Sequence, residues 1–440
     1  MNDQVLEESV LATVDQLNLF QTPVIQSAIE RSSILEFRPT TQLNSTSDCP
    51  IRFFLGGDSR HYLDISRTRL HVKAKLVRAD GSQIEKSEIA APVNQLLQSL
   101  WSSIELKISG KTVCMTTNGT YPYVAYFQTL LKQSDATKSS QLCTQMYFKE
   151  NGGVLMDENP EVNLGFVRRK QLFEESAIVS MEGPLAVDFW STNRFLLCNT
   201  SVDLTLFRSR PEFVVQAKGD ENYKISIVDV FLRAHYVIVS PGVISGQAAG
   251  LRSGANALFP YVRTECKTFN IASGSRSFRF DNVLNSSYPQ RILIAFVRSD
   301  SFSGKKELNP FFFHHFDLSQ IEVSVDGVSV PGRPISCKFD DKGRDAAEGL
   351  LRLYDCIGTS NSQLFSNGLD ITDFVHGFSI FAFPLNAGDL GNNFLEVMKT
   401  GNISVQGVFG SATDKSVTMI LYSESTSVIE IDQSRNVTVH

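Results

Sequence analysis

The adjacent pair His314-His315, in the run NPFFFHHFDL, is the most suggestive candidate for a metal site in this sequence. Successive side chains of a strand point to opposite faces of the sheet, so the two imidazoles cannot easily bind one ion. No third ligand follows at a recognisable spacing, and a metal enzyme of the cupin kind would need an HxH pattern with later Glu and His residues. We therefore interpret Phe311 to Phe316 as an aromatic strand or strand entrance, and we expect no metal site.

Two further segments carry residue types that are used in binding or catalysis. GGDSRHYLD, at Gly56–Asp64, has glycines and a histidine, but no helix follows it, so we interpret it as a turn before a strand rather than a phosphate-binding loop. The basic cluster Arg168-Arg169-Lys170 is interpreted as a solvated turn, with contact to a neighbouring subunit or to packaged nucleic acid as the alternative. We therefore predict no catalytic residues, no cofactor and no enzyme activity.

Composition and charge exclude several classes of protein. The chain has 440 residues, 42% of them hydrophobic, and a net charge of −6, whereas a dedicated nucleic-acid binder is usually basic. No window of about 18 apolar residues exists, so no membrane span is expected. The N-terminus lacks the basic start of a secretory signal. The cysteines form no CxxC or metal-ligand spacing, and we expect free, mostly buried thiols in a reducing compartment. They are Cys49, Cys114, Cys143, Cys198, Cys266, Cys337 and Cys356.

One strand pattern occurs twice in the sequence, and the two copies are about half the chain length apart. Ser102–Val113 reads SSIELKISGKTV, and Ser319–Val330 reads SQIEVSVDGVSV. In each copy apolar and polar residues alternate and a turn pair follows, Ser109-Gly110 or Asp326-Gly327, so each copy predicts a strand, a tight turn and a return strand. The residues expected on the core face are Ile104, Leu106 and Ile108 in the first copy and Ile321, Val323 and Val325 in the second.

Two further matches occur in the same order along the chain. Arg69–Asp80, RLHVKAKLVRAD, matches Arg291–Asp300, RILIAFVRSD, and both lie before their copy of the strand. Val202–Phe207, VDLTLF, matches Val417–Tyr422, VTMILY, and both lie after it. Matches that recur in order indicate a tandem duplication.

The duplicated unit predicts an all-β fold of two tandem eight-stranded jelly rolls with few short helices. Amphipathic segments at Thr120–Leu131 and Ala346–Ile357 predict helices at the same place in each half. We expect an N-terminal arm or helix at residues 1–33, a first jelly roll at 34–215 and a second at 216–440.

The N-terminal segment lies outside the duplicated unit. Asp3–Leu19 has apolar residues at helical spacing, which predicts a short helix. This helix either docks on its own sandwich or reaches a neighbouring molecule as an arm. The candidate arm contacts are Leu6, Val10, Val14 and Leu17.

Several motifs together resemble the double jelly-roll major capsid proteins, most closely those of Polinton-type elements, adintoviruses and related DNA viruses. None of the motifs is catalytic, and their combined order rather than any single piece carries the resemblance. They are YLDISRTRLHVKAKL at Tyr62–Leu76, VNQLLQSLWSSIELKISG at Val93–Gly110, TYPYVAYFQTLL at Thr120–Leu131, KTFNIASG at Lys267–Gly274, NPFFFHHFDLSQIEVSVDG at Asn309–Gly327 and VIEIDQSRNV at Val428–Val437.

The resemblance implies a structural protein of an icosahedral DNA virus or an integrated viral element. In that lineage three chains form a hexon-like trimer, and two similar rolls per chain make it pseudo-hexagonal. The implied partners are further copies of the chain in a capsid lattice, together with minor capsid or penton proteins, and no sequence-specific nucleic acid. The implied location is the virion, with the protein made and assembled inside the host cell rather than secreted.

Two other functions remain open from the sequence. A glycan-binding tandem sandwich would carry exposed aromatic side chains on its loops and often clustered carboxylates for calcium, and neither stands out. A peptide N-glycosidase-like enzyme also has tandem jelly rolls, with carboxylates between them, but such an enzyme is normally secreted. The mass of the protein in solution distinguishes a trimer or larger shell from both.

Overall fold

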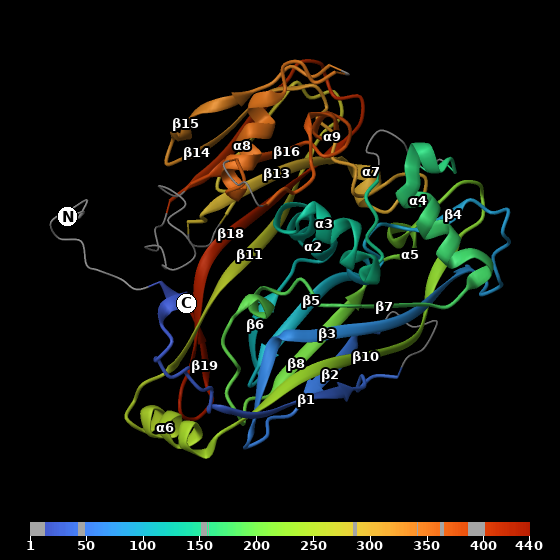
Figure 1. Ribbon diagram of the computed structural model, residues 1–440. Helices are drawn as coiled ribbons and strands as arrows, with labels where there is room; N and C mark the ends of the chain where they lie inside the picture. The colour runs from blue at the N-terminus through green and yellow to red at the C-terminus, as the bar shows by residue number, and fades with distance from the viewer. Residues whose placement is uncertain are drawn as a thin grey trace.

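The computed structural model describes residues 14–42, 49–150, 156, 158–284, 288–340, 342–360, 365–385 and 401–440. These residues form two antiparallel β-sandwiches, the first in the lower part of Figure 1 and the second in the upper part. The long strands of the second sandwich run down beside the first, so the two units share a broad contact (Figure 1).

The first sandwich consists of two four-stranded sheets and a small side sheet. One sheet has the order β1 (Ile29–Phe37), β10 (Tyr223–Val239), β3 (His61–Arg78), β7 (Val179–Gly183). The other has the order β2 (Ile51–Leu55), β8 (Val202–Arg208), β5 (Trp101–Ile108), β6 (Lys111–Met115). The side sheet pairs β4 (Ala90–Pro92) with β9 (Val215–Ala217).

The second sandwich also has two principal sheets. One has the order β11 (Ala257–Ile271), β18 (Val417–Ile431), β13 (Arg291–Arg298), β16 (Ile380–Pro384), with β19 (Val437–Val439) added beside β18. The other has the order β12 (Ser277–Phe280), β17 (Ile403–Phe409), β14 (Leu318–Val325), β15 (Val328–Ser336).

The two sandwiches have the same topology. Taken in chain order, the eight strands of the first occupy the same sheet positions as the eight of the second, and in each the chain passes repeatedly from one sheet to the other. This arrangement of eight antiparallel strands in two sheets is the jelly roll. The predicted all-β fold of two tandem jelly rolls is therefore confirmed.

Strands β5 and β14 confirm the sequence match that suggested duplication. Both lie third in their sheet, and both continue through a tight turn into the neighbouring edge strand. Leu106 pairs with Leu204 of β8, and Val323 pairs with Val405 of β17. Arg69–Asp80 and Arg291–Asp300 fall at equivalent strands too, β3 and β13.

The third sequence match was wrong. Val202–Phe207 lies in β8, whose counterpart is β17, whereas Val417–Tyr422 lies in β18, whose counterpart is β10. The error has a physical cause. Interior strands are all rich in apolar residues, so a short stretch of one interior strand resembles a short stretch of any other.

The pairing of strand β10 bears on where the first roll ends and the second begins. Strand β10 pairs along its length with β3 and β1, so it completes the first sandwich. Strand β1 begins at Ile29, within the segment assigned to the arm. We propose that the boundary falls in helix α6 (Pro241–Arg252), which leads from β10 to β11.

Helices α2 (Tyr121–Lys132) and α8 (Ala347–Ile357) confirm the two predicted helices, and each follows the last strand of the equivalent hairpin. The other α-helices are α1 (Leu96–Ser99), α3 (Asp135–Ser139), α4 (Pro160–Phe173), α5 (Pro211–Val214), α7 (Ser299–Phe302) and α9 (Ile371–Val375). Short 3-10 helices lie at Asp15–Leu17, Gln141–Gln145, Glu174–Ser176 and Asp188–Ser191. Among the described residues no helix has the length and hydropathy to cross a membrane.

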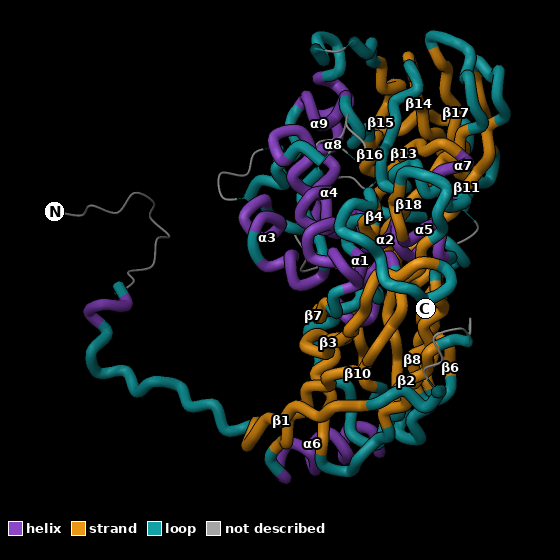
Figure 2. Tube along the Cα trace, turned by 90° about the vertical axis from the view of Figure 1, so that its right-hand side faces the viewer, coloured by secondary structure: helices purple, strands orange, loops and turns teal. Residues whose placement is uncertain are grey.

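The N-terminal segment projects from the body of the molecule (Figure 2). Leu6 and Val10 lie outside the described residues, as does most of the helix expected at Asp3–Leu19. In the described part, a 3-10 helix at Asp15–Leu17 precedes an irregular chain that runs to β1. Val14 and Leu17 are both exposed there.

Candidate functional site

Helix α2 lies at the joint between the two rolls. Pro122 stands in its first turn, where the missing N–H costs nothing because that group has no partner within a helix. All its side chains except those of Gln128 and Lys132 are buried. A helix that is apolar on every side is a core helix, and here the core is shared by both rolls.

Aromatic side chains of α2 stack on aromatic side chains of the second roll. Tyr126 stacks on Phe311 with ring centroids 4.3 Å apart, and Phe127 stacks on Phe313 at 5.3 Å. Each such pair contributes about 0.5–1.5 kcal/mol beyond the burial of its area. The run NPFFFHHFDL therefore serves to join the rolls.

An ion triad around a buried carboxylate continues the joint. Glu424 of β18 is 1% exposed, and its carboxylate lies 2.7 Å from Lys132 Nζ of α2 and 2.6 Å from Arg291 Nη2 of β13. Burial by itself raises the pKa of Glu424, but the two cations outweigh it and lower that pKa to about 2. The carboxylate is thus held charged between the first roll and the second.

A second buried network begins at Arg169 on α4, which has no exposed surface. Its guanidinium pairs with the carboxylate of Glu150 and donates to the Pro92 carbonyl at 2.8 Å. Glu150 also accepts a 2.8 Å hydrogen bond from Asn309 Nδ2 of the second roll. The interpretation of this basic cluster as a solvated turn was therefore wrong for Arg169, because a long-range carboxylate compensates its charge.

Two further polar contacts cross the joint. Asp188 accepts a hydrogen bond of 2.9 Å from the Thr264 backbone N–H of β11, and burial raises the pKa of Asp188 to about 6. Lys138 Nζ donates at 2.6 Å to the carbonyl of Asn367, and burial lowers the pKa of Lys138 to about 7. Asp188 and Lys138 are thus both bonded to the second roll, and such directional bonds help fix how one roll sits on the other.

Comparison with known proteins agrees with this architecture. No family model matches the chain. An uncharacterized protein of Caenorhabditis elegans is 24% identical over 398 residues, which cover 88% of this chain and 92% of that protein.

Among solved structures, the Sputnik virophage structure matches with a TM-score of 0.66 and 12% identity, over 100% of this chain and 94% of that chain. The capsid of the virus PBCV-1 matches with a TM-score of 0.57 and 9% identity, over 96% and 98%. The mavirus major capsid protein matches with a TM-score of 0.53 and 12% identity, over 100% and 97%. The chain has the double jelly-roll fold of viral major capsid proteins.

Within this double jelly-roll fold, His314 and His315 have aromatic surroundings. His314 lies between Phe312 and Phe316, with ring centroids at 4.1 and 5.0 Å, and His315 stacks on Phe339 at 4.1 Å. Burial lowers the pKa of both histidines, that of His314 to about 4. No cluster of three or more His, Cys, Asp or Glu side chains suited to a metal ion occurs in the described ranges.

The remaining candidate residues have structural positions in the double jelly-roll. In the segment at Gly56–Asp64, residues 56–60 form the turn that leads into β3, as expected, and His61 is already the first residue of that strand. All seven cysteines are free; Cys198, Cys266, Cys337 and Cys356 are buried, whereas Cys49 and Cys143 are exposed. The sequence carried no signal for the Arg169 network, since its members are distant in the chain and meet only when the rolls pack.

Proposed function

We propose that this chain is a major capsid protein that assembles as a pseudo-hexagonal trimer, with no enzymatic role. Its fold neighbours include major capsid proteins. The proposed setting is the virion of an icosahedral DNA virus or the shell of an integrated viral element of the Polinton kind, assembled inside the host cell. Further proposed partners are minor capsid or penton proteins.

The observation that carries this proposal is the repeated topology of the two rolls. Three chains with two equivalent rolls each present six similar blocks around a threefold axis. In such a ring each roll contacts the next roll. Within a chain the first roll contacts the second, and between chains the second roll contacts the first roll of the next chain. These two contacts are equivalent. The element equivalent to α2 is α8, so α8 should face the neighbouring chain.

The surface of α8 suits that position. Its inner face packs on its own roll through Leu350, Leu353 and Cys356, which are buried, while Leu351 is 55% exposed on the other side. Leu351 thus offers apolar surface at the place where the proposed neighbouring chain would lie.

The mass of the protein in solution tests the proposal. Light scattering at micromolar concentration should give three times the 48.9 kDa mass of one chain, or a larger shell. L351D should lower that mass to one chain because it places a charge in the proposed interface, and the volume-conserving variant L351M should not. A full-length protein that stays monomeric at micromolar concentration would disprove the trimer.

A further inference from the structure

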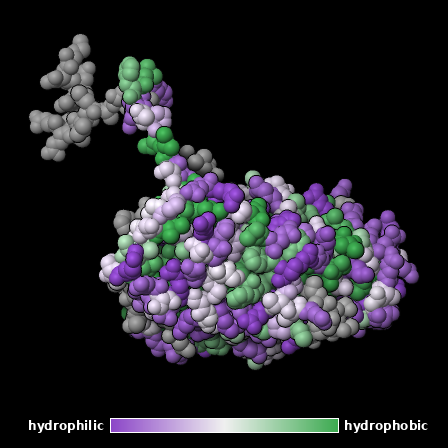
Figure 3. Space-filling model, turned by 90° about the horizontal axis from the view of Figure 1, so that it is seen from below, coloured by the Kyte–Doolittle hydropathy of each residue, from purple (hydrophilic) through white to green (hydrophobic). Residues whose placement is uncertain are grey.

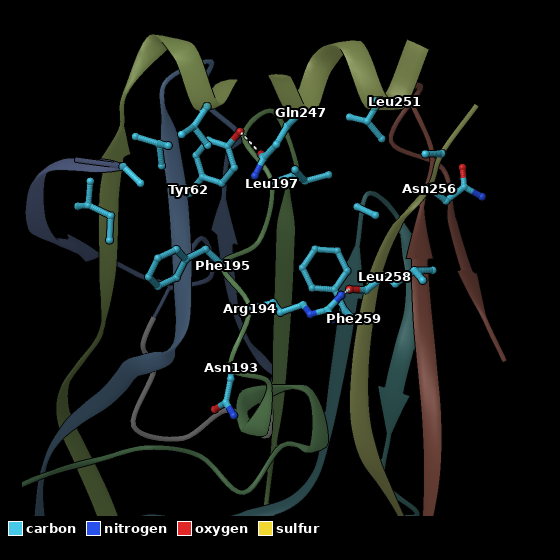
Figure 4. A pocket seen from close by; sticks show the side chains of 17 residues that line it. Tyr62, Asn193, Arg194, Phe195, Leu197, Gln247, Leu251, Asn256, Leu258 and Phe259 are labelled. Carbon is cyan, nitrogen blue, oxygen red and sulfur yellow. Dashed lines mark hydrogen bonds between the residues drawn. The ribbon is translucent and has the colours of Figure 1, made fainter. Parts of the chain in front are cut away.

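An apolar groove lies beneath helix α6, where the bases of the two rolls come together (Figure 4). It has a volume of about 690 Å³. Tyr62 and Phe195 line it from the first roll, Leu251 from α6, and Leu258 and Phe259 from the second roll.

Helix α6 covers this groove incompletely. None of its side chains is fully buried, so the helix lies over the groove rather than packing into a core. Tyr62 Oη donates a hydrogen bond of 2.8 Å to Gln247 Oε1, which ties the helix to the first roll (Figure 4). Leu258 and Phe195 remain 45% and 36% exposed at the groove. The groove thus presents apolar surface with room for further side chains.

The N-terminal arm, defined here as residues 14–28, carries a matching excess of apolar surface. Leu17, Leu19 and Phe20 are 68%, 76% and 98% exposed. Val24 and Ile25 are 99% and 87% exposed. Figure 3 shows apolar side chains on the arm and on the underside from which it leaves. Contiguous apolar surface of this kind marks an interaction site in soluble proteins.

The arm leaves the body at the edge of the groove but points away from it. Ala28 and Ile29 line the groove, and the Ala28 carbonyl accepts a 2.8 Å hydrogen bond from the Ser240 N–H at the start of α6. The side chain of Gln26 accepts from the Ile29 N–H at 3.1 Å and donates to the Ile29 carbonyl at 3.2 Å. These bonds fix the direction in which the chain leaves, and Figure 2 shows the arm extending outward.

We propose that the arm of one chain docks in the groove beneath α6 of a neighbouring copy. Fully extended, the arm spans about 50 Å, which takes its apolar residues well beyond their own groove to an adjacent subunit. A second copy is the occupant that the structure favours, since every copy supplies one exposed apolar arm and one apolar groove. This inference rests on the proposed assembly of several copies.

Two glycines on α6 provide a matched pair of variants. Gly250 lines the groove, and a Cβ built there would meet no atom within 4 Å. Gly246, one turn earlier, also has open space around a Cβ, but it is not part of the groove lining. G250W should therefore add bulk at the groove from a position where a Cβ meets no atom, whereas G246W makes the same change on the same helix outside the groove lining.

Cross-linking between copies tests the docking in the full-length chain. Cys49 and Cys143, the exposed thiols, are first replaced by serine. One tagged population then carries F20C on the arm, and a second, with a different tag, carries L258C at the groove. After the two are mixed, dissociated and reassembled, a short bis-maleimide should give a product that holds both tags. G250W in the groove-bearing population should lower its yield at least about tenfold, as expected when a groove is blocked. G246W should leave the yield unchanged.

The outcomes separate this inference from the proposed function. An assembly of normal mass without the two-tag product would overturn arm docking and leave the capsid proposal intact. A chain that carries both cysteines and cross-links only within itself would show that the arm folds into its own groove, which also overturns docking between copies. An equal loss of product in G246W and G250W would show that the groove is not the site. A monomeric protein would overturn both proposals.

Discussion

Helices α2 and α8 hold equivalent positions in the two rolls, but they differ greatly in burial. In α2 nearly every side chain is buried, whereas α8 buries only Gly349, Leu350, Leu353 and Cys356. The difference is explained by what lies opposite each helix. The second roll covers α2 within the same chain, and no part of the described chain covers the outer side of α8 at Leu351.

The comparison shows how one duplicated position adapts to two kinds of contact. A contact made within a chain forms as the chain folds, so it can be apolar throughout. A surface that contacts another chain is exposed to water before assembly, so it must keep the separate chain soluble. Helix α8 accordingly carries Glu348, which pairs with Arg352 and Arg333 at the surface. The predictions below test whether the two positions differ as proposed.

The largest effect should come from removing an aromatic side chain at the joint. F127A deletes the ring that stacks on Phe313 and leaves a cavity, so it should lower the free energy of unfolding by about 3–5 kcal/mol. The variant L351A on the equivalent helix α8 should lower that free energy much less, because Leu351 is 55% exposed within its own chain. Denaturant titration of both variants measures the difference, and equal losses would contradict the proposed contrast.

The next effect concerns the buried carboxylate of the joint. E424Q leaves Lys132 and Arg291 facing each other without a counter-charge, which should cost about 3 kcal/mol or more of stability. Because the folded-state pKa of Glu424 is lowered to about 2 from an ordinary value of 4.5, its stabilising effect is present above pH 4.5 and is lost as the pH falls toward 2.

Thermal unfolding of wild type and E424Q between pH 7 and pH 2 checks this prediction. The two melting temperatures should differ most at pH 7 and converge as the pH approaches 2. D281N is the control, since Asp281 forms an exposed pair with Arg279 and its loss should leave the melting temperature nearly unchanged. A constant gap between wild type and E424Q at every pH would refute the assigned role of the carboxylate.

The joint also shows where sequence reasoning succeeds and where it stops. Strands β5 and β14 were predictable because alternation and a following turn are local properties of Ser102–Val113 and Ser319–Val330. The assignment of β10 to the first roll was not predictable, because it depends on pairing with β1 and β3, which are distant in the chain. The burial of Arg169 could not be predicted for the same reason: Glu150 and Asn309 compensate it only after the rolls pack.

A smaller effect is expected from removing the arm. Deletion of residues 1–27 should leave both rolls folded and change the melting temperature little, since the arm side chains from Leu17 to Ile25 are exposed. The cut stops before Ala28, whose carbonyl bonds Ser240. Light scattering should show weaker association between trimers, while the trimer itself persists. Unfolding of the truncated chain would show that the arm belongs to the fold, and unchanged association would show that it makes no contact between copies.

The smallest effect on stability, but a clear contrast between the rolls, should come from thiol chemistry. The second roll holds Cys266, Cys337 and Cys356, which are all buried, and burial raises the pKa of these thiols to about 12, 11 and 12. Thiolates are the reactive form, so the three should resist alkylation in the folded protein. Exposed Cys49 and Cys143, both in the part of the chain before β10, should react first.

Intact-mass measurement after alkylation distinguishes these classes. The native protein should gain label at Cys49 and Cys143, and the denatured protein, without reductant, should gain label at all seven cysteines. Peptide mapping assigns each label to its roll. Incomplete labelling after denaturation that reductant restores would reveal a disulfide. Rapid native labelling at Cys266 or Cys356 would mean that the second roll opens far more readily than its buried core implies, and the two rolls would then differ in dynamics as well as in their contacts.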